Sequence, residues 1–383
     1  MKYKPDSAEV SSLRNEIADF IKNGGALPKK EREDKFNRLA VELFKLQFNA
    51  IDSYSKYCRK KNVTPENIND YLQIPPMPVS AFKSGDIFIY SNEEIYITFK
   101  TSGTSGSERG NAYFSRSCAE LTSLAIVENA KKYMFPDGAD TRFFLIAPSP
   151  EAMPNLTMAF GITEVMKNIG PYGGKHYLGA EGLKTEELMS DLKKCELEKI
   201  PASIIAPSFA MVAILDKLAE KNMAFKMAPG SRVLDAGGFK GRSREVSRPD
   251  MVEMIGGRFS IRPEYCINAL GMSELGTQYY DNNIKNHAAG IEAPVAKENP
   301  HWAKTLVMKL DGDMNYLAPG AFGVNGALVH FDLSNFDRAL AILTDDLGCY
   351  REGGFEVLGR IKEGDLKGCS LTIEELIKKS GSN

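Results

Sequence analysis

The amino-acid sequence predicts an α/β fold: a mostly parallel sheet covered by helices, followed by a β-rich C-terminal part. Two observations carry this prediction. Strand-like and helix-like segments alternate from about residue 95 to 269, and strand-like segments dominate from about 304. Such alternation is typical of parallel sheets, because each crossover places a helix on a face of the sheet. The alternating segments are 95–99, 117–133, 143–147, 158–168, 185–198, 203–205, 208–222, 232–234, 243–256 and 264–269.

The region before this alternation, about 1–75, is predicted to be helical. Apolar residues recur at helical spacing over 7–22 and 31–60, with a glycine-rich stop between the two segments. The β-rich part supplies further strands at 306–308, 327–329, 341–343 and 355–358. No internal repeat or low-complexity segment interrupts the chain. We therefore expect one α/β body over 1–358 and a short C-terminal arm over 359–383.

Composition excludes several classes of protein. Hydrophobic residues make up 43% and charged residues 26% of the chain, as in ordinary globular proteins, and the net charge of −2 does not favour nucleic acid or an anionic membrane surface. No signal peptide or membrane-spanning run is apparent, so a cytoplasmic location is expected. The six cysteines have no zinc-binding spacing, and no HExxH motif occurs among the four histidines. Free thiols are therefore expected, and a His-rich metal site is not.

A loop rich in hydroxyls and glycine follows the first strand of the alternating region. Apolar residues alternate up to Phe99, and Thr101-Ser102-Gly103-Thr104-Ser105-Gly106 follow directly. Such a loop can curl its N–H groups and hydroxyls around a polyphosphate. It lacks the Gly-Lys-Ser/Thr ending of a Walker loop. The loop predicts either a phosphate site or an ordinary surface turn.

Four further segments place glycine or a polar group just after a predicted strand. Because ligands bind beyond the carboxyl ends of the strands in a parallel sheet, these segments are expected to converge on one crevice. They are Asp235-Ala236-Gly237-Gly238-Phe239, Gly271-Met272-Ser273-Glu274, Thr344-Asp345-Asp346-Leu347-Gly348 and Gly359-Arg360.

The order and content of these motifs resemble the adenylate-forming, acyl-CoA synthetase-like superfamily. The loop at 101–106 is similar to its phosphate loop, 271–274 to its Gly-Met-Thr-Glu segment, 344–346 to its Thr-Gly-Asp, and 359–360 to its Gly-Arg. Within it, the chain resembles the acyl-protein synthetases of the bacterial luciferase fatty-acid reductase complex. That likeness rests on Leu366-Lys367-Gly368-Cys369-Ser370-Leu371 and the acidic helical tail that follows. Few residues follow Arg360, so the small C-terminal domain usual in the superfamily is expected to be missing, as in the acyl-protein synthetases.

The resemblance implies ATP and Mg²⁺ as cofactors and a carboxylic acid, most simply a fatty acid, as substrate. Glu274 would hold Mg²⁺ and act in catalysis, because this hard cation takes one or two carboxylates plus phosphate oxygens. Asp346 would accept hydrogen bonds from the ribose, and Arg360 would reach ribose or phosphate. Leu270 stands where many relatives carry an aromatic residue beside the base. The other residues implied in ATP or AMP binding are Thr101, Ser102, Gly103, Thr104, Ser105, Gly106, Gly237, Gly238, Phe239, Gly271, Met272 and Ser273.

Cys369 is the second catalytic residue that the resemblance implies. Thr372-Ile373-Glu374-Glu375 has the pattern of a capping box, so a helix is expected to start shortly after the thiol. A helix N-terminus and nearby Lys367 both favour thiolate, the nucleophilic form. The implied reaction converts a carboxylate and ATP to acyl-AMP, passes the acyl group to Cys369 as a thioester, and then to a partner such as an acyl reductase. The other five cysteines are expected to be packing residues.

Three alternatives stay open from the sequence. The first is an acyl-CoA ligase that passes the acyl group to CoA instead of Cys369. The second is a non-catalytic subunit that binds nucleotide or acyl group, which the expected lack of the lysine-bearing C-terminal domain favours. The third is a serine acyltransferase or hydrolase using Ser273, although the segment at 271–276 misses the Gly-x-Ser-x-Gly spacing by one residue.

Overall fold

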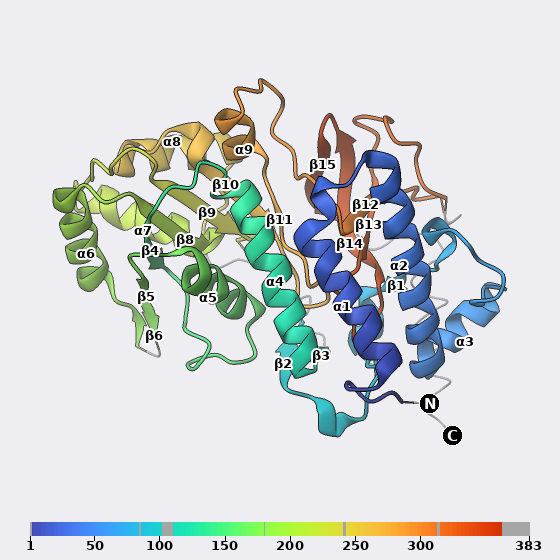
Figure 1. Ribbon diagram of the computed structural model, residues 1–383. Helices are drawn as coiled ribbons and strands as arrows, with labels where there is room; N and C mark the ends of the chain where they lie inside the picture. The colour runs from blue at the N-terminus through green and yellow to red at the C-terminus, as the bar shows by residue number, and fades with distance from the viewer. Residues whose placement is uncertain are drawn as a thin grey trace. The chain divides into compact units, whose positions relative to one another are not determined.

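The computed structural model describes residues 2–83, 86–101, 110–179, 181–239, 243–311 and 315–361 (Figure 1). The chain forms two compact units. Unit 1 comprises the described residues of Met1–Ala125, Met272–Thr277 and Asn299–Asn383, and unit 2 comprises those of Ile126–Gly271 and Gln278–Glu298. The chain therefore leaves unit 2 after Gly271 and returns to it at Gln278. The boundary predicted at 358/359 stays a prediction, because only three residues beyond it are described.

Unit 2 is built on the predicted mostly parallel sheet. Its strand order is β11-β10-β9-β8-β4-β5, and every pair except β10–β11 is parallel. The predicted α/β class is confirmed here. The strands are β4 (Arg142–Leu145), β5 (Gly174–His176), β8 (Ala202–Pro207), β9 (Arg232–Ala236), β10 (Cys266–Leu270) and β11 (Tyr279–Tyr280), and a small hairpin joins β6 (Leu178–Gly179) to β7 (Gly182–Leu183).

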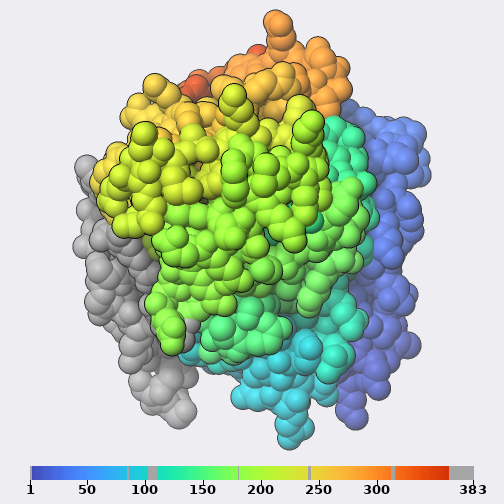
Figure 2. Space-filling view, turned by 90° about the vertical axis from the view of Figure 1, so that its left-hand side faces the viewer, coloured from blue at the N-terminus to red at the C-terminus, as the bar shows by residue number. Residues whose placement is uncertain are grey.

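Apolar residues cover both faces of this sheet. On β8 and β9, Ile204 and Val233 pack into one buried cluster, whereas their neighbours Ile205 and Leu234 pack into another. Helices α6, α7 and α8 supply the first cluster and α4, α5 and α9 the second, and the outer surface of the first layer appears in green and yellow in Figure 2. The helices are α4 (Arg116–Tyr133), α5 (Thr157–Ile169), α6 (Thr185–Glu198), α7 (Ser208–Glu220), α8 (Arg248–Phe259) and α9 (Asn283–Ala288), with the 3₁₀ turn η5 (Pro263–Tyr265).

Unit 1 contains a second, largely antiparallel sheet, as predicted for the β-rich part. Its order is β1-β14-β13-β12, with β15 also paired to β14. The short strand β1 lies parallel to β14, whereas β12, β13, β14 and β15 pair antiparallel in succession. The strands are β1 (Met77–Pro78), β12 (Ala303–Met308), β13 (Gly326–Asp332), β14 (Ala341–Arg351) and β15 (Gly354–Arg360), and β2 (Ile97–Lys100) forms a separate hairpin with β3 (Asn111–Phe114).

The N-terminal region of unit 1 is helical, as predicted. The segment expected as one helix over 31–60 is divided at Ile51, whose backbone is extended and whose side chain is buried. Periodicity does not reveal this break, because a single extended residue leaves apolar spacing on either side intact. The elements are α1 (Ala8–Asn23), η1 (Gly24–Ala26), α2 (Lys29–Ala50), α3 (Asp52–Lys60), η2 (Tyr71–Gln73), η3 (Val79–Lys83) and η4 (Asn92–Glu94).

The prediction that two of the polar segments follow the ends of strands is wrong. Thr344–Gly348 lies inside β14, and Gly359-Arg360 lies inside β15. The polar residues there suggested that the strands had ended, but they continue because the antiparallel ladder between β14 and β15 pairs their backbones from Arg351–Gly354 to Asp346–Arg360. The helix predicted at 243–256 begins later, at Arg248, where Ser247 provides the N-cap and Pro249 follows within the first turn.

Among the described residues, no helix combines the length and the apolar character needed to span a membrane.

Candidate functional site

Asp346 and Arg360 are brought together by the register of unit 1's sheet. They are direct partners across β14 and β15, and Arg360 Nε lies 3.1 Å from Asp346 Oδ1. Asp346 is buried and Arg360 is half-exposed. Burial raises the pKa of Asp346, against which the nearby Arg360 charge acts. The pair thus offers a ligand one acceptor and one cation, held next to each other on a rigid ladder.

Ser273 joins its motif to the strand that precedes the phosphate-loop candidate. Its hydroxyl donates a hydrogen bond to the carbonyl of Lys100, at the end of β2, over 2.9 Å. Met272–Glu274, the part of this motif that belongs to unit 1, therefore lies next to Lys100 and the start of the loop at Thr101. This geometry explains how motifs more than 170 residues apart in the chain reach one place.

Thr101 closes the base of the predicted phosphate loop. Its N–H donates to the carbonyl of Gly110 over 3.0 Å, and its hydroxyl accepts from the Gly110 N–H over 2.9 Å. Gly110 is required there, because an added Cβ would lie 2.4 Å from the carbonyl oxygen of Phe82. The remaining loop residues of the predicted site, Ser102, Gly103, Thr104, Ser105 and Gly106, lie outside the described residues.

Glu274 is a buried acid that has no ion-pair partner among the described residues. Burial raises the pKa of Glu274 to about 7, while the charges of Arg360 and Arg338 lower it and Asp345 raises it further. Among the described residues, no side chain donates a hydrogen bond to this carboxylate. Such a group has a large free energy to gain from a cation, because its own surroundings neutralise its charge incompletely. Its environment therefore fits the predicted Mg²⁺ ligand.

The backbone around Glu274 is held by a residue that the sequence did not single out. Asn335 donates from Nδ2 to the Glu274 carbonyl over 3.0 Å and accepts at Oδ1 from the Gly276 N–H over 2.7 Å. Arg338, which is fully buried, donates to the same Oδ1 over 2.9 Å. The signal was present as a run rich in polar residues, Asp332-Leu333-Ser334-Asn335-Phe336-Asp337-Arg338, which starts at the last residue of β13. Nothing in the sequence tells which of these polar residues lies beside Glu274.

Gly237, Gly238, Phe239 and Gly271 belong to unit 2 and follow its strands at the carboxyl edge, as predicted. The first three residues follow β9, and Gly271 follows β10, its parallel neighbour. Gly237 has a φ of +74°, which disfavours a residue with a side chain. Phe239 packs its ring against the buried cluster under α6, α7 and α8. The turn thus presents backbone to one side and is anchored by Phe239 on the other.

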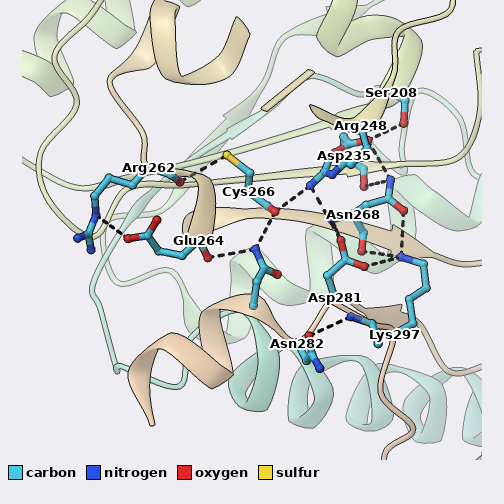
Figure 3. A network of polar contacts seen from close by, with 12 residues as sticks. Ser208, Asp235, Arg248, Arg262, Glu264, Cys266, Asn268, Asp281, Asn282 and Lys297 are labelled. Atoms are coloured by element: carbon cyan, nitrogen blue, oxygen red, sulfur yellow. Dashed lines mark hydrogen bonds and ion pairs between the residues drawn. The ribbon is translucent and has the colours of Figure 1, made fainter. Parts of the chain in front are cut away.

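A network of charged and polar residues, most of them buried, lies beneath this turn and was not predicted (Figure 3). Asp235 accepts from Arg248 at Oδ1, and at Oδ2 from Ser208 Oγ over 2.8 Å and Asn268 Nδ2 over 2.9 Å. The network continues from Asn268 to Asp281 and Lys297, whose Nζ lies 2.9 Å from Asp281 Oδ1. Arg248, which is partly exposed, also lies 4.0 Å from Asp281, so two acids and two bases alternate along the network and their charges compensate one another.

The cysteines of the described residues are packing residues, as predicted. All five are buried and free. Burial raises the pKa of Cys118 and that of Cys266 to about 12, and it also raises the pKa of Cys58 and Cys195. These four thiols are therefore poor nucleophiles at neutral pH. Cys369, with the capping box predicted at 372–375, lies outside the described residues.

The fold resembles solved adenylate-forming enzymes. A 2-hydroxyisobutyryl-CoA ligase in an open conformation, in complex with 2-HIB-AMP and CoA, matches with a TM-score of 0.64 and 14% identity over 88% of this chain and 76% of that one. The same ligase in its thioesterification state matches with a TM-score of 0.65, over 88% and 70%. At this identity the likeness concerns the fold, and it agrees with the predicted adenylate-forming body.

Sequence relatives extend over nearly the whole chain. The long-chain-fatty-acid–luciferin-component ligase of Aliivibrio fischeri is 22% identical over 361 residues, which cover 91% of this chain and 90% of the relative. That of Vibrio harveyi is 21% identical over 364 residues, covering 92% and 91%. The family model described as acyl-protein synthetase, LuxE, matches residues 6–378. The chain belongs to the acyl-protein synthetase, LuxE, family.

Proposed function

We propose that this protein activates a carboxylic acid, in the simplest case a long-chain fatty acid, with ATP and transfers the acyl group to Cys369. Membership of the acyl-protein synthetase family supports the activity, and the names of both ligase relatives support the fatty acid. The single structural observation that carries the proposal is Glu274: a buried carboxylate whose pKa burial raises to about 7 and on which the charge of Arg360 acts.

Glu274 is assigned to Mg²⁺. Glu274 would hold the metal, which would supply positive charge to stabilise the departing pyrophosphate. The fit rests on the chemistry of the site. Glu274 accepts no side-chain hydrogen bond among the described residues, and burial raises its pKa because its negative charge is incompletely compensated. A bound cation would compensate that charge.

The nucleotide is assigned to the other predicted residues. Asp346 accepts from the ribose hydroxyls, and Arg360, half-exposed at the end of β15, reaches ribose or phosphate. The loop at 101–106 holds the β- and γ-phosphates, with Thr101 closing its base. Gly237, Gly238 and Phe239 form the wall beside the adenine, and Gly271, Met272 and Ser273 complete the strand end that leads to Glu274.

The reaction has two balanced steps. A carboxylate oxygen attacks the α-phosphorus of ATP, the bond to the bridging oxygen breaks, and pyrophosphate leaves with that electron pair. The Cys369 thiolate then attacks the acyl carbon, and AMP leaves as the C–O bond breaks. Covalent relay through the thiol divides one difficult transfer into two easier ones. The thioester then serves an acceptor protein such as an acyl reductase.

A labelling experiment tests the proposal. The full chain is incubated with ATP, Mg²⁺ and a panel of radiolabelled carboxylic acids, and hydroxylamine-sensitive label on the protein is measured. We expect ATP-dependent label with at least one acid, and its loss in Cys369→Ser. The matched control is Cys195→Ser, which keeps a donor to the Ile200 carbonyl and should label like the wild type. If label survives in Cys369→Ser, the assignment of the acceptor is wrong.

Two of the remaining alternatives predict different outcomes in the same assay. An acyl-CoA ligase would give acyl-CoA when CoA is added, and Cys369→Ser would leave that product unchanged. A non-catalytic subunit would bind ATP without carboxylate-dependent exchange of labelled pyrophosphate into ATP. A serine hydrolase is disfavoured by the hydrogen bond from Ser273 to the Lys100 carbonyl, which engages the hydroxyl proton with the backbone.

A further inference from the structure

The turn at Gly237–Phe239 is connected to the buried charges below it through one hydroxyl. Ser208 Oγ lies 2.8 Å from Asp235 Oδ2 and 2.8 Å from the carbonyl oxygen of Gly237. Both neighbours are acceptors, and a serine hydroxyl has one proton to donate. The proton is therefore shared between the carboxylate and the backbone of the turn.

Ser208 makes these contacts instead of serving its own helix. It is the first residue of α7, directly after β8, and no side-chain cap is formed at that helix end. The side chain is buried, so water does not compete for the hydroxyl. Burying a hydroxyl costs free energy of folding unless its hydrogen bonds compensate for the lost contact with water. The two hydrogen bonds of Ser208 provide that compensation, and an apolar residue could not form them.

Asp235 is held by two further side chains, so its oxygens have little capacity left for a ligand. Arg248 reaches Oδ1 from the start of α8, and Asn268 reaches Oδ2 from β10 (Figure 3). Arg248 also donates to the Cys266 carbonyl over 2.8 Å, which ties α8 to the start of β10. The carboxylate thus joins α7, α8, β9 and β10 at the carboxyl edge of the sheet. A group so committed positions its neighbours and does not itself bind substrate.

The opposite end of β9 provides a natural comparison. Ser231, also buried, accepts from the Ala202 N–H over 2.9 Å and donates to the Ala228 carbonyl. The adjacent Arg232 is fully buried and pairs with Asp137 over 2.9 Å. This end of the strand therefore has the same chemistry, a buried serine and a buried ion pair, but it lies at the amino edge, away from the edge where ligands bind in parallel sheets.

We propose that Ser208, supported by Asp235, is a positioning residue for nucleotide binding: it fixes the Gly237 carbonyl and hence the wall that faces the adenine. The inference rests on the proposed function, because that wall is assigned there to ATP. Loss of the hydroxyl frees the turn, whose glycine at 237 has a wide range of backbone conformations available. Binding of the adenosine part should weaken, and chemistry on a bound nucleotide should not.

The test compares Ser208→Ala with Ser231→Ala in the full-length chain. We measure the Kd of AMP by calorimetry and the KM values of ATP and of the carboxylic acid in pyrophosphate exchange. For Ser208→Ala we expect Kd and the KM of ATP to rise about tenfold, as for one lost buried hydrogen bond, with kcat and the KM of the acid unchanged. Ser231→Ala should leave all four constants at their wild-type values, even if both variants melt at a lower temperature. Ser208→Thr keeps the hydroxyl and should restore most of the affinity.

The outcomes separate this inference from the proposed function. If the wild type shows no carboxylate-dependent exchange, the proposed function fails, whereas AMP binding still reports on the wall. If the wild type is active and Ser208→Ala resembles Ser231→Ala in every constant, the inference is wrong. The inference is also wrong if Ser208→Ala and Ser208→Thr both lower kcat and raise both KM values to a similar extent. A general disturbance of the fold would then explain the effect of Ser208→Ala.

Discussion

Asp235 in unit 2 and Glu274 in unit 1 are both acids with little exposed surface, yet their surroundings are opposite in kind. The exposed fraction is 3% for Asp235 and 6% for Glu274. Asp235 accepts hydrogen bonds from three side chains, including one cation. Among the described residues, Glu274 accepts no side-chain hydrogen bond; the more distant charges of Arg360, Arg338 and Asp345 act on it, and burial raises its pKa to about 7.

The difference distinguishes a buried acid that stabilises the fold from a buried acid that is available to a ligand. A buried acid that accepts from several donors stabilises the elements that supply those donors, and it leaves little for a ligand to use. A buried acid without donors destabilises the folded state, and the folded state tolerates it where a ligand compensates. Burial alone does not distinguish the two acids, whereas the identity of their partners does.

The largest expected effect comes from Glu274→Gln. Carboxylate-dependent pyrophosphate exchange should fall by about 100- to 1000-fold, because the group assigned to Mg²⁺ is lost. The variant should nevertheless unfold at a higher temperature than the wild type at pH 8, since a charge buried without a partner has been removed. Glu356→Gln, an exposed acid of β15 paired with Arg351, should change neither quantity much. A Glu274→Gln variant that keeps its exchange activity would contradict the assignment to Mg²⁺.

Asp235→Asn should act in the opposite direction on stability. Weakening the pair between buried Asp235 and the partly exposed Arg248 is expected to lower the free energy of unfolding by about 2 kcal/mol. The control is Asp216→Asn, which breaks the exposed pair between α7 and Arg244 and should cost less than about 1 kcal/mol. Urea denaturation of both variants at one pH measures the two values. Equal effects would mean that Asp235 does not join the elements around it.

The pH dependence should show the same contrast in the wild type. Because the folded-state pKa of Glu274 lies above its unfolded value of 4.5, the folded protein binds more protons between pH 4.5 and about 7. This group therefore makes stability fall as pH rises through that window, by up to about 3 kcal/mol. Glu274→Gln should remove that fall, whereas exchange activity in the wild type should rise through about pH 7 as the carboxylate forms. A difference in unfolding free energy between wild type and Glu274→Gln that does not vary from pH 4.5 to 8 would contradict the raised pKa.

Arg360→Gln should give the smallest effect. Its charge lowers the pKa of Glu274, so the variant should move the midpoint of that stability change to higher pH. Arg360 is half-exposed and screened by solvent, so we expect a shift of about half a pH unit or less, smaller still at high salt. The measurement is made without nucleotide, and Arg351→Gln serves as the control. A downward shift would show that Arg360 does not act on Glu274.

The sequence predicted the family, the α/β class and most helices and strands, because these depend on local periodicity and on short motifs. The residues that surround the motifs were out of its reach. Asn335 and Ser208 act on Glu274 and Gly237 across 61 and 29 positions of the chain, and no local pattern encodes such a pairing. Asp346 and Arg360 were expected to meet as loops after parallel strands. They are instead partners in an antiparallel ladder. The prediction that the two residues lie together is therefore confirmed, whereas the predicted loop geometry is wrong.

The pairing of β1 with β14 has a consequence for synthesis on the ribosome. Gln47 of α2 is bonded to the backbone of Asn335 and Leu340, and β1 takes its place beside Ile342 and Leu343. The N-terminal helices are therefore synthesised long before the strands of the unit 1 sheet against which they pack. Unit 2 is complete once Glu298 has emerged, so it can fold while they wait. A nascent chain halted before β14 would carry one folded unit and a set of helices with uncovered apolar faces, which is the kind of client that chaperones hold.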